Sequence, residues 1–278
     1  MKNDEKIKTQ KKTTRRKYII GIFFIILIAT SLSLCFFQKE PEPDPESEAL
    51  IRQLAAESLQ KDPNDLTDED LAKITRLSLI RNSHSDVFNY VEISDIKLLE
   101  KFTNLEYLSL RKITFPDKKI PKWAKKLSML GIECFENRYV INFKPLQNLT
   151  NLNNLDLRNT MISDLRPLKE LKKLEKLNLN NTKISNIKPL QNLTNLNYID
   201  LSNTKISDLT PLKDLMKLET LILDKTQISN IESLKNLKNM QKLSIINCPN
   251  ITNEQIHGLQ EIYPELEIIS VKERGFGF

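Results

Sequence analysis

Hydrophobic residues recur along most of this chain with a period of 22 residues. Four consecutive segments, 146–167, 168–189, 190–211 and 212–233, align without a gap, and leucine or isoleucine fills the same positions in each. Two further columns accompany them: Pro145, Pro167, Pro189 and Pro211, and Thr160, Thr182, Thr204 and Thr226. A single unit of this length cannot bury its apolar side alone. The pattern therefore predicts units that stack on one another and share one continuous core.

Each unit contains a pair of core residues two positions apart. This spacing predicts a short β-strand, because alternate side chains of a strand share one face. The first member of the pair falls at Leu77, Leu108, Leu130, Leu155, Leu177, Ile199, Leu221, Leu243 and Leu266. A period of 20–29 residues with this spacing is the signature of leucine-rich repeats. We therefore predict an α/β solenoid with about nine parallel strands, a leucine-rich repeat horseshoe whose sheet forms the concave face.

The repeats are expected to span residues 71–270, between two caps. Three steps between strands exceed 22 residues, and the surplus in 81–92 and 133–142 is predicted to form loops. Residues 49–70 are predicted to form an N-terminal helical cap. It would contain a helix over 48–61 and a second helix starting near Thr67 and Asp70. At the other end we expect a longer helix over 254–261, a last strand at 266–269 and a tail over 271–278.

Two short motifs recur within the repeats. Asn-Leu-Thr-Asn-Leu occurs at 148–152 and 192–196, and Ile-Ser-Asp-Leu-x-Pro-Leu occurs at 162–168 and 206–212. In these motifs the chain resembles the internalin-type leucine-rich repeat proteins of bacteria over residues 71–269. The resemblance implies a solenoid that binds a protein ligand on its concave face. Threonine stands where that family usually has asparagine, and the membrane segment lies at the N-terminus instead of a C-terminal wall-sorting signal. Host-cell invasion is therefore not expected.

A membrane-spanning segment is predicted at residues 18–37, which carry no charge. Twenty helical residues are about 30 Å long, which matches the hydrocarbon core of a bilayer. Residues 1–17 are strongly basic, whereas residues 38–48 are acidic and rich in proline. Basic residues stay on the cytoplasmic side, so 1–17 is expected to be a cytoplasmic tail. The repeats would then lie outside the cytoplasm, beyond a stiff linker over 38–48.

Three fates are open for the segment 18–37. A retained signal anchor is favoured by the full length of the span and by the long basic region before it. Cleavage as a signal peptide is the second fate, because Ser31 and Ser33 offer small residues at the spacing of a cleavage site. Lipid attachment to Cys35 is the third. Residues 32–35 resemble a bacterial lipobox, although Leu34 is larger than the usual residue.

The formal net charge of +6 does not indicate nucleic-acid binding. Residues 1–17 hold eight basic and two acidic residues and account for all of this charge. The rest of the chain holds 34 basic and 34 acidic residues of the totals of 42 and 36. The basic tail is expected at the inner membrane surface, where anionic lipids attract it. We therefore expect a membrane and a protein as partners, and no nucleic acid.

The sequence shows no recognisable catalytic chemistry. Its two histidines, His84 and His257, are far apart, and no group of cysteine, histidine and aspartate has the spacing of a metal site. The five glycines form no phosphate-binding loop, and no nucleophile elbow is present. We predict a protein that is not an enzyme and that has no metal, cofactor or small-molecule substrate.

The cysteines are not expected to pair. Cys134 and Cys248 lie about five repeats apart, or roughly 24 Å along the stack. A disulfide requires Cα atoms within about 7 Å. Cys248 is instead expected to fill the turn position that threonine has in the other repeats.

Residues flanking the core pair are expected to point outward from the concave face, where they vary while the core positions repeat. The candidate ligand-binding residues are Tyr107, Arg111, Asp156, Arg158, Lys176, Asn178, Tyr198, Asp200, Ile222, Asp224, Lys242 and Ile246. Tyrosine and arginine are enriched in interface hot spots, and neighbouring exposed apolar residues are typical of contact sites. We predict a mixed polar and apolar protein-binding patch centred on Tyr198, Ile222 and Ile246.

The leading interpretation is a membrane-anchored protein-interaction module displayed outside the cytoplasm. The alternative is a structural or envelope protein that binds a cell-surface polysaccharide or self-associates. A polysaccharide binder would favour a row of exposed aromatic residues, and only Tyr107 and Tyr198 are expected on the concave face. A third interpretation is a regulator that binds a cytoplasmic enzyme. It requires a topology opposite to the one that the basic residues predict.

Overall fold

The structure, a computed structural model, describes residues 45–79, 91–92, 95–110, 113–114 and 142–270. By its contacts the chain divides into two compact units, Met1–Glu42 and Pro43–Phe278. All of the described residues belong to the second unit. The predicted membrane segment at 18–37 therefore lies outside them. Within the described ranges, no helix is long and apolar enough to cross a membrane.

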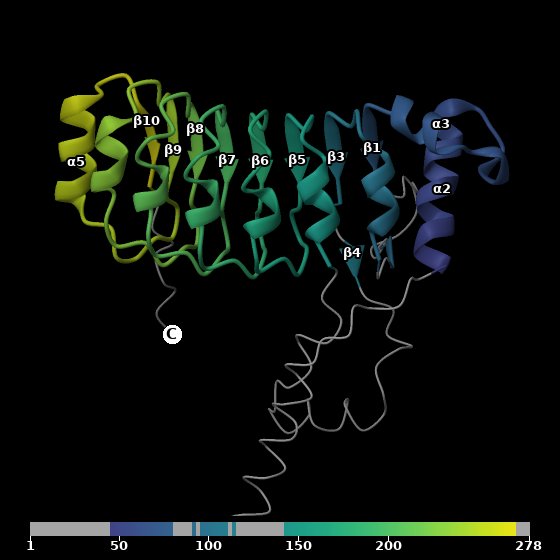
Figure 1. The fold of residues 1–278 in the computed structure, drawn as a ribbon. Helices are drawn as coiled ribbons and strands as arrows, with labels where there is room; N and C mark the ends of the chain where they lie inside the picture. Colours follow the sequence, from purple (N-terminus) through teal and green to yellow (C-terminus); the bar gives the residue numbers. More distant parts are fainter. Residues whose placement is uncertain (1–44, 80–90, 93–94, 111–112, 115–141, 271–278) are drawn as a thin grey trace, which may run out of the picture. The chain divides into compact units, whose positions relative to one another are not determined.

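The second unit contains an eight-stranded parallel sheet (Figure 1). The strands of this sheet are arranged in chain order, and each pairs with the one that follows it in the sheet. Its strands are β1 (Arg76–Ser78), β3 (Tyr107–Ser109), β5 (Asn154–Asp156), β6 (Lys176–Asn178), β7 (Tyr198–Asp200), β8 (Thr220–Ile222), β9 (Lys242–Ser244) and β10 (Glu267–Ile269). The central residue of each strand pairs with that of the next, as Leu155 does with Leu177 and then with Ile199. The chain is thus a leucine-rich repeat solenoid, as the 22-residue period predicted.

Short 3-10 helices lie on the other side of the repeats from the strands (Figure 1). They are η2 (Lys97–Lys101), η4 (Lys144–Asn148), η5 (Arg166–Leu168), η6 (Lys188–Leu190), η7 (Thr210–Leu212) and η8 (Glu232–Asn236). Proline stands in the first turn of η4, η5, η6 and η7. Its fixed φ suits a helix start, and the N–H that it lacks has no partner inside the helix there. The proline column therefore starts the return segment of each repeat.

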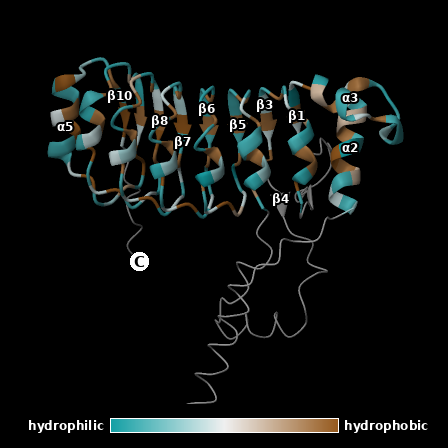
Figure 2. Cartoon of the chain, viewed as in Figure 1, coloured by the Kyte–Doolittle hydropathy of each residue, from teal (hydrophilic) through white to brown (hydrophobic). Residues whose placement is uncertain are grey.

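One continuous hydrophobic core runs between the strands and the 3-10 helices. Hydrophobic positions recur at the same level of successive repeats (Figure 2). Leu155, Leu177 and Ile199 are fully buried, as are the 3-10 helix residues Leu168 and Leu190. Each repeat therefore contributes the same side chains to the core, and its stability depends on its neighbours.

The threonine column holds the turn after each strand. Thr160, Thr182, Thr204 and Thr226 each donate a hydrogen bond from Oγ1 to the carbonyl three residues earlier, at 2.6–2.7 Å. The preceding residue adopts a positive φ of 54–58° in each case, and it is asparagine in three of them and Lys225 in the fourth. Asparagine tolerates this region better than most residues. The threonines therefore hold the turns by bonds inside each repeat.

The two ends of the solenoid carry α-helices. At the start, α2 (Pro45–Leu59) is followed by η1 (Pro63–Asp65) and α3 (Asp68–Lys73). Thr67 and Asp70 form a capping box that begins α3, as their spacing predicted. At the other end, α5 (Asn253–Ile262) covers the region predicted as a helix over 254–261. It begins with a second capping box, formed by Thr252 and Gln255.

The predicted strand at Leu130 is not inserted in the sheet. Residues 115–141 lie outside the described ones, but β3 pairs directly with β5, so that Leu108 faces Leu155. No strand therefore lies between them. The predicted place of Leu130 in the sheet, between Leu108 and Leu155, is therefore wrong, although its 22-residue step from Leu108 matches the repeat length. A separate two-stranded sheet joins β2 (Val91–Glu92) to β4 (Ile113–Thr114), so part of the first predicted loop is paired.

The register of the last strand also differs from the prediction. We expected Leu266 and Ile268 as its core pair, but Ile268 faces Leu243 and Ile269 faces Ser244. Leu266 instead donates its N–H to the Tyr263 carbonyl, at 3.1 Å. Met240 makes the same bond, to the carbonyl of Leu237, at the start of the preceding repeat. Leu266 is therefore the buried residue that precedes the strand.

Candidate functional site

The outward face of the eight-stranded sheet, here called the sheet face, consists of the residues that flank the buried strand centres. Its first column contains Arg76, Tyr107, Asn154, Lys176, Tyr198, Thr220, Lys242 and Glu267, which pair in register across the sheet. The second column runs two residues further along each strand. Of the twelve predicted site residues, eight stand in these two columns. Arg158, Asp224 and Ile246 follow β5, β8 and β9 by two residues. Arg111 lies outside the described residues.

Tyr107 is paired with a cation. The guanidinium of Arg76, on the neighbouring strand β1, lies over the Tyr107 ring at 4.4 Å from its centre. A cation over an aromatic face gains about 0.5–1 kcal/mol at an exposed site. Arg76 was not among the predicted site residues, although its register with Tyr107 places it beside the ring.

Asp156, Asn178 and Asp200 cap the ends of their strands. The Oδ1 atom of each accepts the backbone N–H two residues further on, at 3.0–3.1 Å. Asp156 and Asp200 are only 6% and 8% exposed. These three side chains therefore support the turn, a task that aspartate and asparagine commonly perform in this geometry. Sequence reasoning treated them as ligand candidates and missed this role. The recurrence of aspartate or asparagine at this repeat position was the signal in the sequence that could have indicated a role in the turn.

The charges of Asp156 and Arg158 compensate each other. Arg158 donates from Nη2 to Asp156 Oδ2 at 2.8 Å and from Nε to both carboxylate oxygens at 3.0 Å. This hydrogen bonding raises the pKa of Arg158 above its usual value, although partial burial opposes the change. Arg158 therefore stays charged, and its guanidinium forms an ion pair with Asp156 inside the protein.

Asp224 supports the next repeat and not its own. In the β9 repeat the capping position holds Ser244 and not aspartate or asparagine. Asp224 Oδ1 instead accepts the Ser244 hydroxyl at 2.6 Å and the Ile246 N–H at 2.9 Å. One carboxylate therefore holds the strand end of β9 from the neighbouring repeat.

Tyr198 and Ile222 lie on the sheet face as predicted, and Ile246 follows β9 by two residues. Each of the three is half-buried. Asp200 pairs with Ile222, so Tyr198 and Ile222 are on adjacent strands and two residues out of register. This offset places their Cα atoms about 8 Å apart. Burial raises the pKa of Tyr198 above its usual value, and the Asp200 carboxylate adds to the effect. The Tyr198 hydroxyl is therefore neutral at physiological pH.

The structure adds Ile269 to this group. Ile222, Ser244 and Ile269 face one another across β8, β9 and β10, and Ile269 is half-buried like Ile222. Ile269 belongs to the last predicted strand, but it was not among the predicted site residues. We call Tyr198, Ile222, Ile246 and Ile269 the apolar patch.

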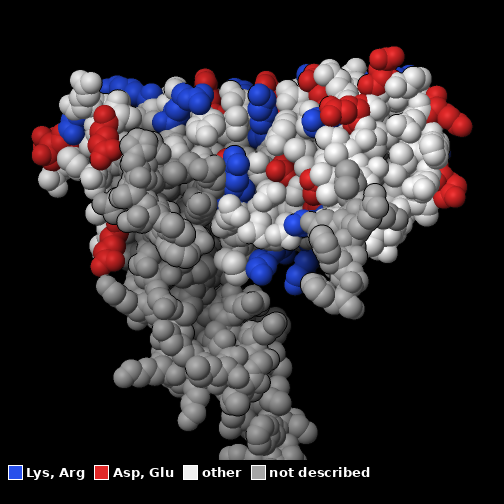
Figure 3. All heavy atoms as spheres, turned by 180° about the vertical axis from the view of Figure 1, so that it is seen from behind, with Lys and Arg blue, Asp and Glu red and all other residues white. Residues whose placement is uncertain are grey.

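The two predicted lysines of the sheet face differ in their surroundings. Lys242 lies 3.3 Å from the Glu267 carboxylate. Lys176 is exposed and, among the described residues, has no carboxylate within 4.0 Å. Figure 3 shows the molecule from the side away from the viewer of Figure 1, and there acidic and basic side chains are interspersed over the described part. This agrees with the balanced charge of the chain beyond residue 17.

Comparison with known proteins agrees with this geometry. A family model described as leucine-rich repeats in two copies matches residues 172–214. The chain is similar to the crystal structure of internalin C2 from Listeria monocytogenes, with 25% identity and a TM-score of 0.55. That match covers 83% of this chain and 93% of the other. The chain is a leucine-rich repeat protein by its fold, and it is similar to internalins.

A second similar structure is a leucine-rich repeat protein of Leptospira interrogans, with 24% identity and a TM-score of 0.52. The match covers 73% of this chain and 51% of that chain, and it concerns the fold alone. No curated protein sequence matches the chain. The repeat region of this internalin-like protein is accordingly a protein-interaction module of the leucine-rich repeat type.

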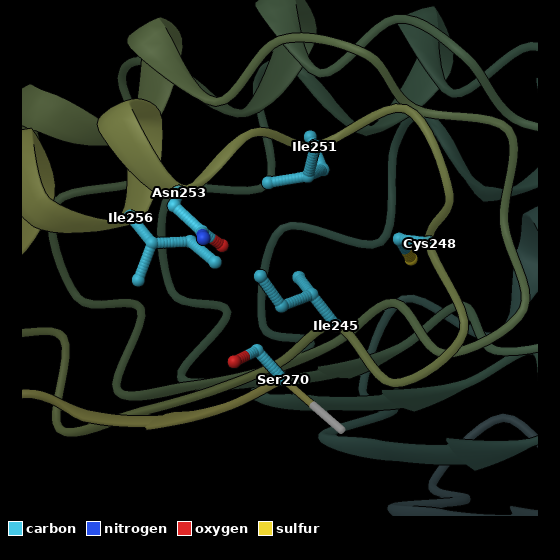
Figure 4. A pocket seen from close by; sticks show the side chains of 6 residues that line it. All are labelled: Ile245, Cys248, Ile251, Asn253, Ile256 and Ser270. Atoms are coloured by element: carbon cyan, nitrogen blue, oxygen red, sulfur yellow. The ribbon is translucent and has the colours of Figure 1, made fainter. Parts of the chain in front are cut away.

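A hollow of about 240 Å³ lies at the C-terminal end of the internalin-like repeats (Figure 4). It is lined by Ile245, Cys248, Ile251, Asn253, Ile256 and Ser270. The register that pairs Ile269 with Ser244 puts Ser270 opposite Ile245, at the second core position of the last strand. Every other strand of the sheet has leucine or isoleucine at this position. The hollow thus lies where the last strand has the short side chain of serine.

Cys248 forms one wall of this hollow and is buried. Its Sγ donates to the Leu223 carbonyl at 3.1 Å and lies 3.4 Å from Thr226 Oγ1. The predicted replacement of a turn threonine by Cys248 is confirmed. Its expected lack of a disulfide with Cys134 stays a prediction, because Cys134 lies outside the described residues. No group of three potential metal ligands occurs in the described ranges.

Proposed function

We propose that this internalin-like protein is anchored in a membrane by residues 18–37 and binds a protein ligand on its sheet face outside the cytoplasm. The observation that carries the proposal is the apolar patch. Its tyrosine and three isoleucines are half-buried on a face where most other outward residues are polar. Neighbouring exposed apolar residues are typical of interaction sites, and tyrosine is enriched in hot spots.

The polar groups around the apolar patch support the same proposal. Asp200 accepts bonds from the Ser202 N–H and hydroxyl at 3.0 and 2.7 Å, and Asp224 is bonded to Ser244 and Ile246. A ligand that covers the patch would therefore not leave these carboxylates without partners. Desolvating an unpaired carboxylate would be costly, so this arrangement lowers the cost of binding.

A crosslinking experiment tests the binding proposal. Thr220 lies between Tyr198 and Lys242 in register, on the same strand as Ile222 of the apolar patch. The full chain would carry a photo-crosslinking amino acid at Thr220 in its native membrane. A matched variant would carry it at Lys213, beside η7 on the opposite side. A protein adduct at Thr220 and none at Lys213 is expected. Adducts at both positions or at Lys213 alone would contradict the proposal.

The anchor and its direction need a separate test. Fusions of a reporter enzyme that is active only outside the cytoplasm would be made before residue 18 and after residue 48. We expect activity only for the fusion after residue 48, together with membrane retention after high-salt and alkaline washing. Release of an intact repeat region by washing would argue for cleavage at 31–33. Retention that depends on Cys35 would argue for lipid attachment.

Self-association is a second candidate function, favoured by the outer edge of β10. β10 is the last strand of the sheet, and no described strand pairs with its outer side. Open strand edges can pair with another chain. Light scattering of the full chain in detergent tests this candidate. A dimer that is lost on changing Ile268 to proline would support it, because proline removes the N–H of the edge strand.

A further inference from the structure

Three exposed lysines lie together at the edge where the strands end. They are Lys183, Lys205 and Lys225, which follow β6, β7 and β8. Among the described residues none of them has a carboxylate within 4.0 Å or a side-chain hydrogen bond. We call them the lysine strip. Lys183 and Lys205 share one repeat position, whereas Lys225 stands two residues earlier in its repeat, at the position of Asn181 and Asn203. Successive repeats are about 4.8 Å apart along the sheet, so these flexible side chains can approach one short ligand segment.

The carboxylates near this edge are already bonded within the protein. Asp164 forms an ion pair with Arg166 at 2.8 Å, and Asp208 accepts the Thr210 N–H at 2.8 Å. The hydrogen bonds lower the pKa of both aspartates, chiefly through Arg166 for Asp164 and Thr210 for Asp208. The exposed Glu175 and Glu219 precede their strands, at the other edge of the sheet. The lysine strip is therefore the part of this edge whose charges lack internal partners.

The backbone beneath the lysine strip is held in place from repeat to repeat. Asn181 donates from Nδ2 to Asn159 Oδ1 at 2.8 Å, and Asn203 donates to Asn181 Oδ1 at 2.6 Å. The N–H of Lys225 donates to the Ile246 carbonyl at 2.8 Å. A rigid base loses less conformational entropy when a ligand binds. The backbone of Lys225 is therefore hydrogen-bonded directly to Ile246, a residue of the apolar patch.

We propose that the protein ligand presents an apolar anchor beside an acidic segment, and that the two dock on the apolar patch and the lysine strip. This inference rests on the proposed function and names the chemistry of the partner. Lysine ammonium groups attract aspartate and glutamate without demanding one geometry. The sheet face offers no run of aromatic side chains for stacking nucleic-acid bases, and its own acids are engaged. The complementary partner is thus an acidic protein surface.

Peptide binding to the full chain in detergent tests this proposal. One fluorescent peptide has a central Trp-Leu pair between runs of glutamate, and its twin has glutamine in place of every glutamate. By fluorescence polarisation the glutamate peptide should bind at least about five-fold more tightly at low salt, since exposed ion pairs contribute modestly. Raising the salt to about 0.5 M should remove most of the difference.

Matched variants separate the two parts of the site. The triple variant Lys183→Gln, Lys205→Gln and Lys225→Asn neutralises the lysine strip, and asparagine suits the positive φ of 57° at Lys225. It should bind the two peptides equally. The control variant changes Lys188, Lys213 and Lys238, exposed lysines on the side of the 3-10 helices, to glutamine. The control should keep the preference for glutamate.

The outcomes distinguish this inference from the proposed function. If wild type binds both peptides equally and an Ile222→Asp, Ile246→Asp variant loses both, the acidic partner is wrong while the binding face stands. If the patch variant binds as wild type does, both proposals fail. Binding of an acidic polysaccharide that depends on the lysine strip but not on the apolar patch would also overturn the inference. It would assign the strip to a glycan.

Discussion

Asp224 and Ile246 are joined across a repeat boundary, with the Ile246 N–H donating to Asp224 Oδ1 at 2.9 Å. The same oxygen accepts the Ser244 hydroxyl at 2.6 Å. In the β5, β6 and β7 repeats an aspartate or asparagine of the strand itself makes the equivalent bond. On β9 that position is Ser244, so the Ile246 N–H bonds to a carboxylate of the preceding repeat, beside Ile222 and Ile246 of the apolar patch.

Replacing Asp224 with alanine should destabilise the protein. The change leaves the Ile246 N–H and the Ser244 hydroxyl without their acceptor, so we expect a loss of about 1–2 kcal/mol in unfolding free energy. Asp224→Asn retains one oxygen and should recover more than half of the loss. Urea unfolding followed by circular dichroism measures both. Asp214→Ala, at an exposed position outside the sheet face, is the control. Equal stability of Asp224→Ala and the control would refute the role of this bond.

Filling the terminal hollow should stabilise the protein. Ser270 is exposed at the end of the solenoid, but it lines the hollow, and by register it stands opposite Ile245, where the other strands of the sheet have leucine or isoleucine. Ser270→Ile is expected to raise the unfolding free energy by about 0.5–1.5 kcal/mol, as cavity-filling changes commonly do. The midpoint of thermal unfolding should rise by roughly 1–5 °C. Ser207→Ile, at an exposed turn, is the matched control and should give no gain. A lowered midpoint for Ser270→Ile would show that the hollow does not accept the side chain.

Asp70 should make the N-terminal cap sensitive to acid. Lys61 and Lys73 lie 2.8 and 3.1 Å from its Oδ1, and Thr67 donates to its Oδ2. These contacts, Lys61 first, lower the pKa of Asp70 well below its usual range. A carboxyl whose pKa is lowered by folding stabilises the protein above its unfolded pKa, about 3.9, and loses that effect as the pH falls toward the folded pKa.

Asp70→Asn provides the measurement for this effect. The variant should be less stable than wild type at pH 5–7, and the difference should shrink steadily below about pH 4. Unfolding free energies of both proteins at several pH values give the result. Taking the difference removes the contribution of other carboxyls with lowered pKa values, such as Asp164 and Asp208. A difference that is constant with pH would mean that Asp70 acts by packing and not by charge.

The repeats, the turn position of the threonines and the capping box of α3 were predicted from the sequence, and the capping box of α5 follows the same kind of pattern. Each follows from short-range patterns: a 22-residue period, a hydroxyl three residues after a core carbonyl, and a threonine three residues before aspartate or glutamine. Such patterns determine local geometry, and neighbouring repeats then reproduce it.

Two strand predictions were wrong, because the spacing of leucines along the chain did not match the pairing of the strands. Leu130 stands 22 residues after Leu108, yet Leu108 pairs with Leu155. At the last strand, Leu266 and Ile268 have the expected spacing, but the N–H of Leu266 bonds to Tyr263 as a residue before the strand does. Strand pairing depends on contacts between repeats, and spacing within one repeat does not determine it.

The sequence could predict where the candidate site lies, but not which of its side chains are already hydrogen-bonded within the protein. Outward placement of Tyr198, Ile222 and Ile246 follows from strand alternation. The sequence did not reveal that Asp156, Asp200 and Asp224 are engaged by backbone and side-chain donors. Those contacts depend on the turn geometry after each strand.

Capture by a patch variant tests the central claim most directly. The full chain and its Tyr198→Asp, Ile222→Asp, Ile246→Asp variant would each be used in detergent to capture proteins from envelope extracts. Thermal unfolding midpoints would be measured alongside. We predict that a defined protein is captured by wild type and lost by the variant, while the midpoint changes little because the three side chains are only half-buried. Equal capture by two folded proteins would contradict a binding site on the sheet face.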